Sequence, residues 1–188
     1  MSRSKIIAVA IIAIAVVGIY LAIDGLRQVG SNKGYEPDQP IAFSHKVHAG
    51  DNEISCKYCH YSAEKGRHAG IPAVSVCMNC HTNVKADSTE IKKIKDALKN
   101  KQNIEWIKVN RLADFVYFNH SQHVVAGKVE CMACHGPVNN MTRMRQEQDF
   151  TMGWCIDCHR KSDVVVHGTQ NTVKEGDVGG LDCAKCHY

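Results

Sequence analysis

The cysteines constrain this chain more than any other feature, because all ten belong to five copies of the pattern Cys-x-x-Cys-His. The motifs, called sites 1 to 5 in chain order, are Cys56/Cys59/His60, Cys77/Cys80/His81, Cys131/Cys134/His135, Cys155/Cys158/His159 and Cys183/Cys186/His187. Two thiols separated by two residues can reach both vinyl groups of one haem, and the adjacent imidazole can bind its iron. The motifs therefore predict five covalently attached haem c groups.

Two other uses of the cysteines explain the pattern less well. The 17 residues between Cys59 and Cys77 would suit a zinc ribbon, but zinc knuckles work in pairs and the number of motifs is odd. A disulfide framework would explain the even number of cysteines, but not their spacing. Neither alternative gives a reason for a histidine after every second cysteine.

The composition indicates how such a chain folds. Only 6% of its 188 residues are aromatic, which is few for an ordinary core, so we expect the haems to complete the core. This predicts a mostly helical and irregular multihaem cytochrome c fold with little strand. The formal charge of +4 is opposed by two propionates on each haem, so it gives no support for nucleic-acid binding.

The N-terminal segment reads as a membrane anchor. Arg3 and Lys5 precede an uncharged apolar run of 18 residues, 6–23, which as a helix would span about 27 Å of the roughly 30 Å hydrocarbon core. A cleaved secretory signal is the alternative, although its apolar region is usually shorter. Basic residues before the run place the N-terminus in the cytoplasm and the haem region on the periplasmic side of the inner membrane. We expect an anchor helix over 1–27 and a linker over 28–40.

An internal repeat follows the linker. A Phe-x-His-x-x-His element stands 13 residues before the first cysteine of site 1 and again 13 residues before that of site 3. Its copies are Phe43, His45 and His48, and Phe118, His120 and His123. The repeat predicts two tandem class III-like haem modules, over 41–86 with sites 1 and 2 and over 116–188 with sites 3 to 5.

The segment between the modules, 87–115, carries local signals of its own. Asp87 and Ser88 can cap a helix, and apolar residues at helical spacing from Ile91 to Leu98 predict that helix over about 88–100. Alternation of apolar and polar residues over 104–109 predicts a short strand.

Five further axial ligands are needed beyond the motif histidines. The repeat element places two imidazoles one helical turn apart, so His45, His48, His120 and His123 are predicted ligands of different irons. His68, nine residues before Cys77, is the expected partner at the second haem.

The fourth haem is harder to complete, because no histidine lies between His135 and Cys155. Met141 is the expected ligand there, and a thioether would raise the potential of that iron. The alternatives for haem four are Met144, Met152 and His48, and those for haem five are His123 and His167. With six ligands available at every iron, we expect electron transfer and no catalytic residue.

Several segments together carry a family resemblance. With the anchor and the five motifs, the stretch from Trp106 to His120, the sequence His135-Gly-Pro-Val and the sequence Met152-Gly-Trp-Cys155 resemble the pentahaem cytochrome c subunit of alternative complex III. That bacterial respiratory complex oxidises quinol in the membrane. The Phe-x-His-x-x-His element is shared more widely, with class III cytochromes c.

The resemblance implies both partners and a direction of transfer. Electrons would pass from iron–sulfur clusters of a large periplasmic subunit through these haems to a monohaem cytochrome c or a terminal oxidase. Quinone would bind in polytopic membrane subunits. One alternative is a stand-alone membrane-anchored quinol dehydrogenase cytochrome of the nitrate- and nitrite-reductase type, and another is a tethered electron store for soluble cytochromes.

Overall fold

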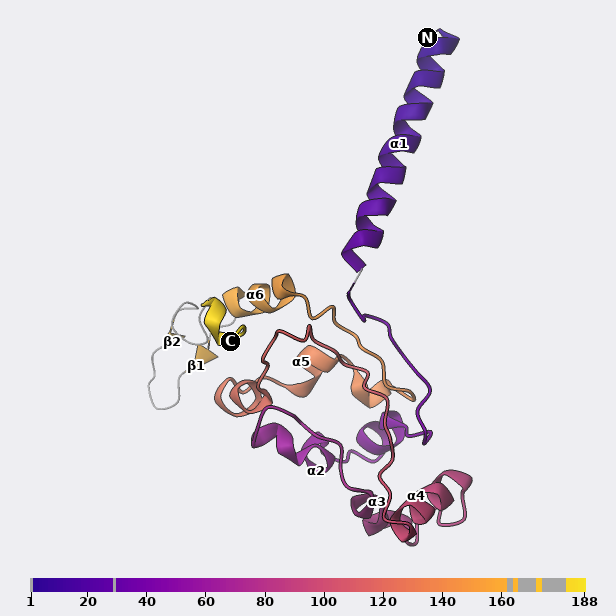
Figure 1. Ribbon diagram of the computed structural model, residues 1–188, viewed down its shortest axis with the longest axis vertical. Coiled ribbons are helices and arrows are strands. Elements are labelled where there is room, and N and C mark those ends of the chain that lie inside the picture. Colours follow the sequence, from indigo (N-terminus) through magenta and orange to yellow (C-terminus); the bar gives the residue numbers. More distant parts are fainter. Residues whose placement is uncertain (1, 29, 162–163, 166–171, 174–181) are drawn as a thin grey trace.

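The computed structural model describes residues 2–28, 30–161, 164–165, 172–173 and 182–188, and this part of the chain is mostly helical and irregular (Figure 1). The α-helices are α1 (Arg3–Gln28), α2 (Cys56–Cys59), α3 (Val74–His81), α4 (Thr89–Lys99), α5 (Cys131–His135) and α6 (Met152–Lys161). Shorter turns of π- or 3₁₀-helix are η1 (Lys46–Asp51), η2 (Tyr61–Glu64), η3 (Gln122–Ala126), η4 (Val138–Asn140) and η5 (Cys183–Lys185). The prediction of a mostly helical fold is confirmed for the described residues.

Strand is limited to one small pair in the described residues. β1 (Val164–Val165) and β2 (Thr172–Val173) run antiparallel, with Val164 opposite Val173. The predicted strand over 104–109 is wrong. The side-chain amide of Gln39 accepts from the Ile107 N–H and donates to the Ile107 carbonyl, both at 2.9 Å, so a single side chain pairs the backbone groups that a neighbouring strand would have paired.

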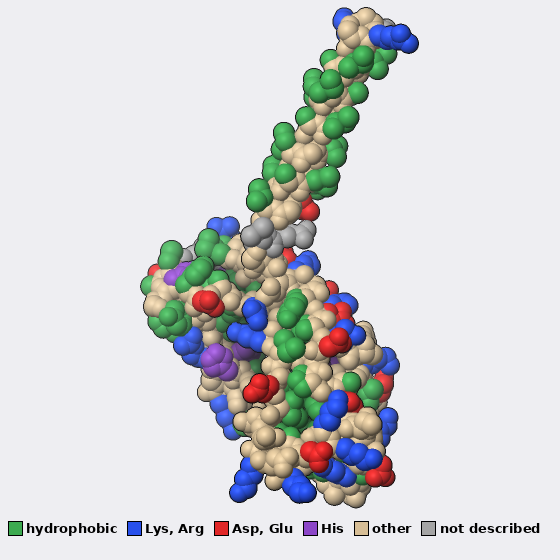
Figure 2. All heavy atoms as spheres, turned by 45° about the vertical axis from the view of Figure 1, so that its right-hand side comes forward, with side chains coloured by type: hydrophobic (Ala, Val, Ile, Leu, Met, Phe, Trp, Pro, Cys, Tyr) green, Lys and Arg blue, Asp and Glu red, His purple; other side chains and the backbone are tan. Residues whose placement is uncertain are grey.

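Helix α1 stands clear of the rest of the chain. Figure 2 shows its apolar side chains pointing outward on the face in view, and none of its most apolar window is buried. A helix that is apolar all round has no polar face for water. Its length and composition suit a membrane span, and a signal sequence would look the same.

The segment after α1 runs along residues 141–149. Gly34 N–H donates to the Gln146 carbonyl at 2.7 Å, and Gln146 N–H donates to the Tyr35 carbonyl at 3.0 Å. Gln146 is fully buried, and its side chain accepts from Arg111 N–H at 3.0 Å and donates to the Gln148 carbonyl at 2.8 Å. This one residue joins three segments of the chain. The segment that follows α1 is therefore fixed to the rest of the described chain, which is called the head below.

A small apolar core joins α3 and α4. Ile91 and Ile94 on α4 and Ile41 are buried together, with Val74 and Trp106 packed against them. The predicted helix over 88–100 is confirmed, and Ser88 caps it by accepting from Ile91 N–H at 3.3 Å. Leu98 lies on the exposed side of the helix.

Candidate haem-attachment region

Short helices present the motif cysteines. Sites 1, 2, 3 and 4 lie on α2, α3, α5 and α6, and site 5 lies on η5. Residues three apart share one face of a helix, so both thiols of a motif point to the same side.

The ten thiols divide equally between exposed and half-buried positions. The half-buried cysteines are Cys59, Cys77, Cys131, Cys134 and Cys155. The exposed cysteines are Cys56, Cys80, Cys158, Cys183 and Cys186. Protein side chains alone therefore do not bury the five exposed thiols, because these thiols lie on short helical turns that the rest of the described chain leaves largely uncovered. Exposure leaves Cys80 and Cys158 accessible for attachment, and their bonding to haem stays a prediction.

The histidines form four ring pairs, each joining one motif histidine to one from a repeat element. The ring centroids are 6.4 Å apart for His45–His60 and for His120–His135, with interplanar angles of 12° and 1°. They are 6.0 Å apart for His48–His81 and for His123–His159, with angles of 58° and 64°. The two copies of the repeat thus give the same geometry at corresponding positions.

These separations fit an iron between each pair. An imidazole binds a metal through nitrogen at about 2 Å, and its centroid lies about 1.1 Å behind that nitrogen, so two rings on opposite faces of one iron have centroids about 6 Å apart. The four pairs therefore have the spacing that bis-histidine ligation requires.

Backbone carbonyls orient most of the rings. Nδ1 lies within hydrogen-bonding distance of a carbonyl oxygen in His48 (Ser44, 2.8 Å), His60 (Gly70, 2.6 Å), His81 (Val84, 2.9 Å), His120 (Arg67, 2.7 Å), His123 (Asn119, 2.8 Å) and His187 (Phe115, 3.0 Å). A carbonyl can only accept, so Nδ1 carries the proton and Nε2 keeps its lone pair for a metal. The main chain thus fixes these six rings in the tautomer that can bind a metal through Nε2.

Two rings have a buried Nδ1 without such an acceptor among the described residues. The buried Nδ1 atoms of His45 and His135 have no hydrogen-bond partner among the described residues. Burial is the main cause that lowers the pKa of each of them to about 4, and neighbouring imidazoles lower it further. Both rings are therefore neutral at ordinary pH, which is the form that binds a metal.

One phenylalanine in each repeat element holds its two histidines. Phe43 meets His45 edge-on at 4.9 Å and stacks on His48 at 4.3 Å. Phe118 meets His120 and His123 at the same two distances. The sequence identified these residues only as a repeated aromatic, and their role in orienting two rings becomes visible in the structure.

Site 5 differs from the others. His187 stacks on Phe115 at 5.5 Å, and Tyr117 N–H donates to the Cys186 carbonyl at 2.9 Å. No second imidazole faces His187 in the part of the chain that the structure describes. His167, one of the two predicted ligands here, lies outside the described residues.

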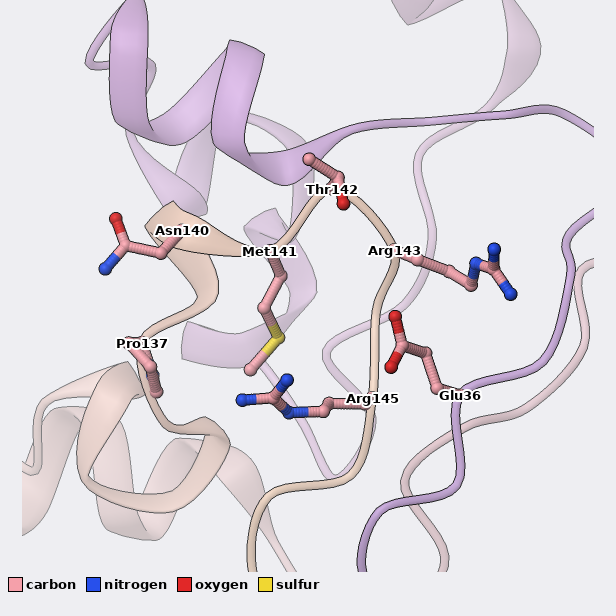
Figure 3. Close-up of a pocket in the computed structure, with 7 residues that line it drawn as sticks. All are labelled: Glu36, Pro137, Asn140, Met141, Thr142, Arg143 and Arg145. Carbon is pink, nitrogen blue, oxygen red and sulfur yellow. The ribbon is translucent and has the colours of Figure 1, made fainter.

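The remaining predicted ligands lie apart from the ring pairs. His68 has an exposed side chain, and the ring beside His81 is that of His48. Met141 is buried and lines a small cavity with Glu36, Arg143 and Arg145 (Figure 3). Met144 is half-buried and Met152 is 67% exposed. The ring beside His159 is that of His123.

The carbonyls that orient the rings were missed by sequence reasoning. Arg67 and Gly70 contribute main-chain oxygens, so their side chains give no signal in the sequence. Gly70 alone carries a trace, because its φ of +73° belongs to the left-handed region that favours glycine.

Comparison with known proteins agrees with haem attachment. Residues 26–108, which contain sites 1 and 2, match the class III cytochrome c family. The chain is also 36% identical over 101 residues to the menaquinone reductase, multiheme cytochrome c subunit, of Nitratidesulfovibrio vulgaris. That alignment covers 53% of this chain and 47% of the relative, so the chain spans about half the length of the relative. The class III match implies covalently bound haem c and an electron-transfer role.

Proposed function

We propose that this chain is the electron-transfer pentahaem cytochrome c subunit of a membrane complex that oxidises quinol, of the alternative complex III type. The observation that carries the proposal is the set of four histidine pairs, each spaced for one iron and each containing a motif histidine. A similar multihaem subunit belongs, by its name, to a menaquinone reductase. The chain is not an enzyme by itself on this proposal, because two imidazoles at each of sites 1 to 4 leave those irons no position for a substrate.

The axial ligands follow from the ring pairs. Site 1 uses His60 and His45, site 2 uses His81 and His48, site 3 uses His135 and His120, and site 4 uses His159 and His123. This geometry favours His48 over His68 at site 2 and His123 over Met141 at site 4. At site 5, His187 is one ligand.

The protein groups have distinct roles in this proposal. Haem c, when bound, supplies reversible one-electron chemistry without a proton donor or acceptor from the protein. The thiols would hold each group covalently and the paired imidazoles would bind its iron, while main-chain carbonyls keep the rings of His48, His60, His81, His120 and His123 in place. Phe43 and Phe118 each contact the repeat-element histidines of two adjacent sites.

The repeat supports two tandem class III-like modules. Residues 41–86 hold sites 1 and 2, residues 116–188 hold sites 3 to 5, and residues 87–115 connect them. In each module a repeat element pairs one imidazole with the next motif along the chain and the other imidazole with the motif after that.

Helix α1 is the anchor in this proposal. Arg3 and Lys5 at its start keep that end in the cytoplasm, so the haem region lies on the periplasmic side of the inner membrane. One helix cannot enclose a quinone, so polytopic subunits provide the quinone site. A large iron–sulfur subunit donates electrons, and a monohaem cytochrome c or a terminal oxidase accepts them.

Gentle detergent extraction of the native membrane tests this function. Intact mass should show five haem c groups on the chain, and the chain should co-purify with polytopic and iron–sulfur subunits. A purified chain that oxidises quinol unaided would instead indicate the stand-alone dehydrogenase. A chain that leaves the membrane without partner subunits in this extraction, and is inert toward quinol, would indicate the electron store. A mass equal to that of the bare polypeptide would exclude every haem-based function.

A further inference from the structure

The two copies of the repeat contact each other through equivalent residues. Corresponding positions differ by 75 in number, as in Phe43 and Phe118. Ser121 N–H donates to the Gly66 carbonyl at 3.1 Å, and Lys46 N–H donates to the Met141 carbonyl at 2.9 Å. Adding 75 to Lys46 and Gly66 gives Ser121 and Met141, so each hydrogen bond is the counterpart of the other.

The helical turns repeat this reciprocity. η1 of the first copy packs on η4 of the second, and η3 of the second packs on η2 of the first. η1 corresponds to η3, and η2 corresponds to η4, within the repeat. Reciprocal contacts of this kind define an isologous interface, as in a twofold dimer. A local twofold axis therefore relates the two copies within one chain.

Sites 1 and 3 meet at this axis. Burial raises the pKa of the Cys131 thiol and the nearby Cys56 thiol raises it further, and these two cysteines are equivalent residues of the two copies. His120 of site 3 is held by a residue of the first module, since both its N–H and its Nδ1 approach the Arg67 carbonyl, at 3.3 and 2.7 Å.

We propose that the five sites form one row in the spatial order 2–1–3–4–5, with electrons crossing between the modules from site 1 to site 3. This rests on the proposed electron-transfer function and extends it, because it names sites 2 and 5 as the ends at which partners exchange electrons.

Contacts within each module give the outer steps. Between sites 2 and 1, Asn79 Nδ2 donates to the Tyr58 hydroxyl at 2.9 Å, and both residues lie inside motifs. Between sites 3 and 4, Phe150 approaches His135 at 6.4 Å and Trp154 at 5.4 Å. Phe43 and Phe118 add a second contact at each of these steps.

The last step joins sites 4 and 5. Burial raises the pKa of the Cys155 thiol and Cys186 lies near enough to raise it further, so the two motifs are neighbours. Figure 1 shows the same order, because α6 lies beside the C-terminal turn at one end of the head, α3 lies at the other end, and α2 and α5 lie between them. Sites 2 and 5 are therefore the two ends of the proposed row.

An experimental structure of the haem-loaded protein, within its complex or in detergent, tests the order directly. The four shortest iron–iron separations should be 2–1, 1–3, 3–4 and 4–5. A separation of sites 1 and 3 greater than that of sites 2 and 3 would overturn the proposal. So would a site 5 iron closer to site 1 or site 3 than to site 4. The result does not depend on which quinone or partner is used, so failure of the proposed function would be seen separately.

A glycine pair tests the axis in solution. A Cβ on Gly50 in η1 would overlap the Asn139 carbonyl oxygen in η4, across the interface, whereas a Cβ on Gly66 would meet no atom within 4 Å. In holoprotein, Gly50→Ala should weaken the excitonic Soret circular dichroism of the adjacent haems at sites 1 and 3 and lower the unfolding temperature, and Gly66→Ala should change neither. A Gly50→Ala protein with unchanged Soret circular dichroism would contradict the interface.

Discussion

Replacing Met141 separates the two ligand assignments for site 4. The Met141 side chain is 5% exposed, and the Met141 main-chain carbonyl accepts from the N–H of Lys46, which belongs to the other copy of the repeat. Leucine has nearly the same volume but no sulfur, so Met141→Leu should cost less than about 1.5 kcal/mol of unfolding free energy. Met141→Ala leaves a cavity and should cost about 2–5 kcal/mol. Because His123 lies opposite His159, neither change should alter the ligation of any iron.

The assay combines spectroscopy with unfolding of the purified holoprotein. Met141→Leu should retain the spin state that each iron has in the parent protein, and no thioether-to-iron charge-transfer band should be present in the parent protein. His123→Leu is the matched variant, since it removes the imidazole of a half-buried side chain and should leave one haem of the five high-spin. High-spin iron in Met141→Leu, with His123→Leu unchanged, would refute the assignment and restore the methionine ligand.

Three further predictions follow from named contacts. His48→Ala should convert one haem to high-spin, while His68→Ala, at an exposed position, should leave the electronic spectrum unchanged; the reverse result would return His68 to site 2. Electron paramagnetic resonance of the oxidised protein should show two classes of low-spin iron. The signals should be rhombic at sites 1 and 3, where the paired ring planes are nearly parallel, and strongly axial at sites 2 and 4, where the paired ring planes are tilted. One uniform class of signal would contradict the ring angles. The Glu90 carboxylate accepts hydrogen bonds from Lys93 and from Ala42 N–H, and both bonds lower its pKa. Glu90→Gln should therefore destabilise the protein at neutral pH, and this destabilisation should disappear as the pH falls through the folded-state pKa of Glu90. Equal destabilisation at every pH in a series of thermal unfolding measurements would contradict this.

The sequence predicted those features that depend on neighbouring residues. Helix α4 forms where its cap and apolar spacing place it, because Ser88 and Ile91 act within a single turn. The attachment motifs are likewise local, since the i, i+3 spacing alone brings two thiols to one side. The strand over 104–109 failed for the opposite reason: the backbone partner at Ile107 is the side chain of Gln39, which is 68 positions earlier in the chain.

Ligand pairing depends on distance in space rather than along the chain. Choosing the nearest unassigned side chain in sequence led to His68 for site 2 and to Met141 for site 4. In the structure His48 faces His81, 33 positions later, and His123 faces His159, 36 positions later. The repeat held this information, because whatever pairs with His48 in the first copy should have a counterpart that pairs with His123 in the second.

The two copies are symmetric in their contacts but not in how they support their rings. Loop 66–70 of the first copy gives a carbonyl to His60 of site 1, through Gly70, and one to His120 of site 3, through Arg67. The corresponding loop of the second copy, 141–145, gives no carbonyl to the equivalent rings, which are those of His135 and His45. The buried Nδ1 atoms of these two rings have no hydrogen-bond partner among the described residues.

Loop 141–145 is engaged elsewhere. Arg143 pairs with Asp38 at 3.1 Å, and Gln146, directly after the loop, is hydrogen-bonded to Tyr35 and Gly34 in the segment that leads to α1. One copy of the loop thus orients rings at the central step, and the other fixes the head to the anchor segment. Each central site consequently has one ring with a carbonyl acceptor and one without, which gives sites 1 and 3 matched ligand sets despite the asymmetry of the loops.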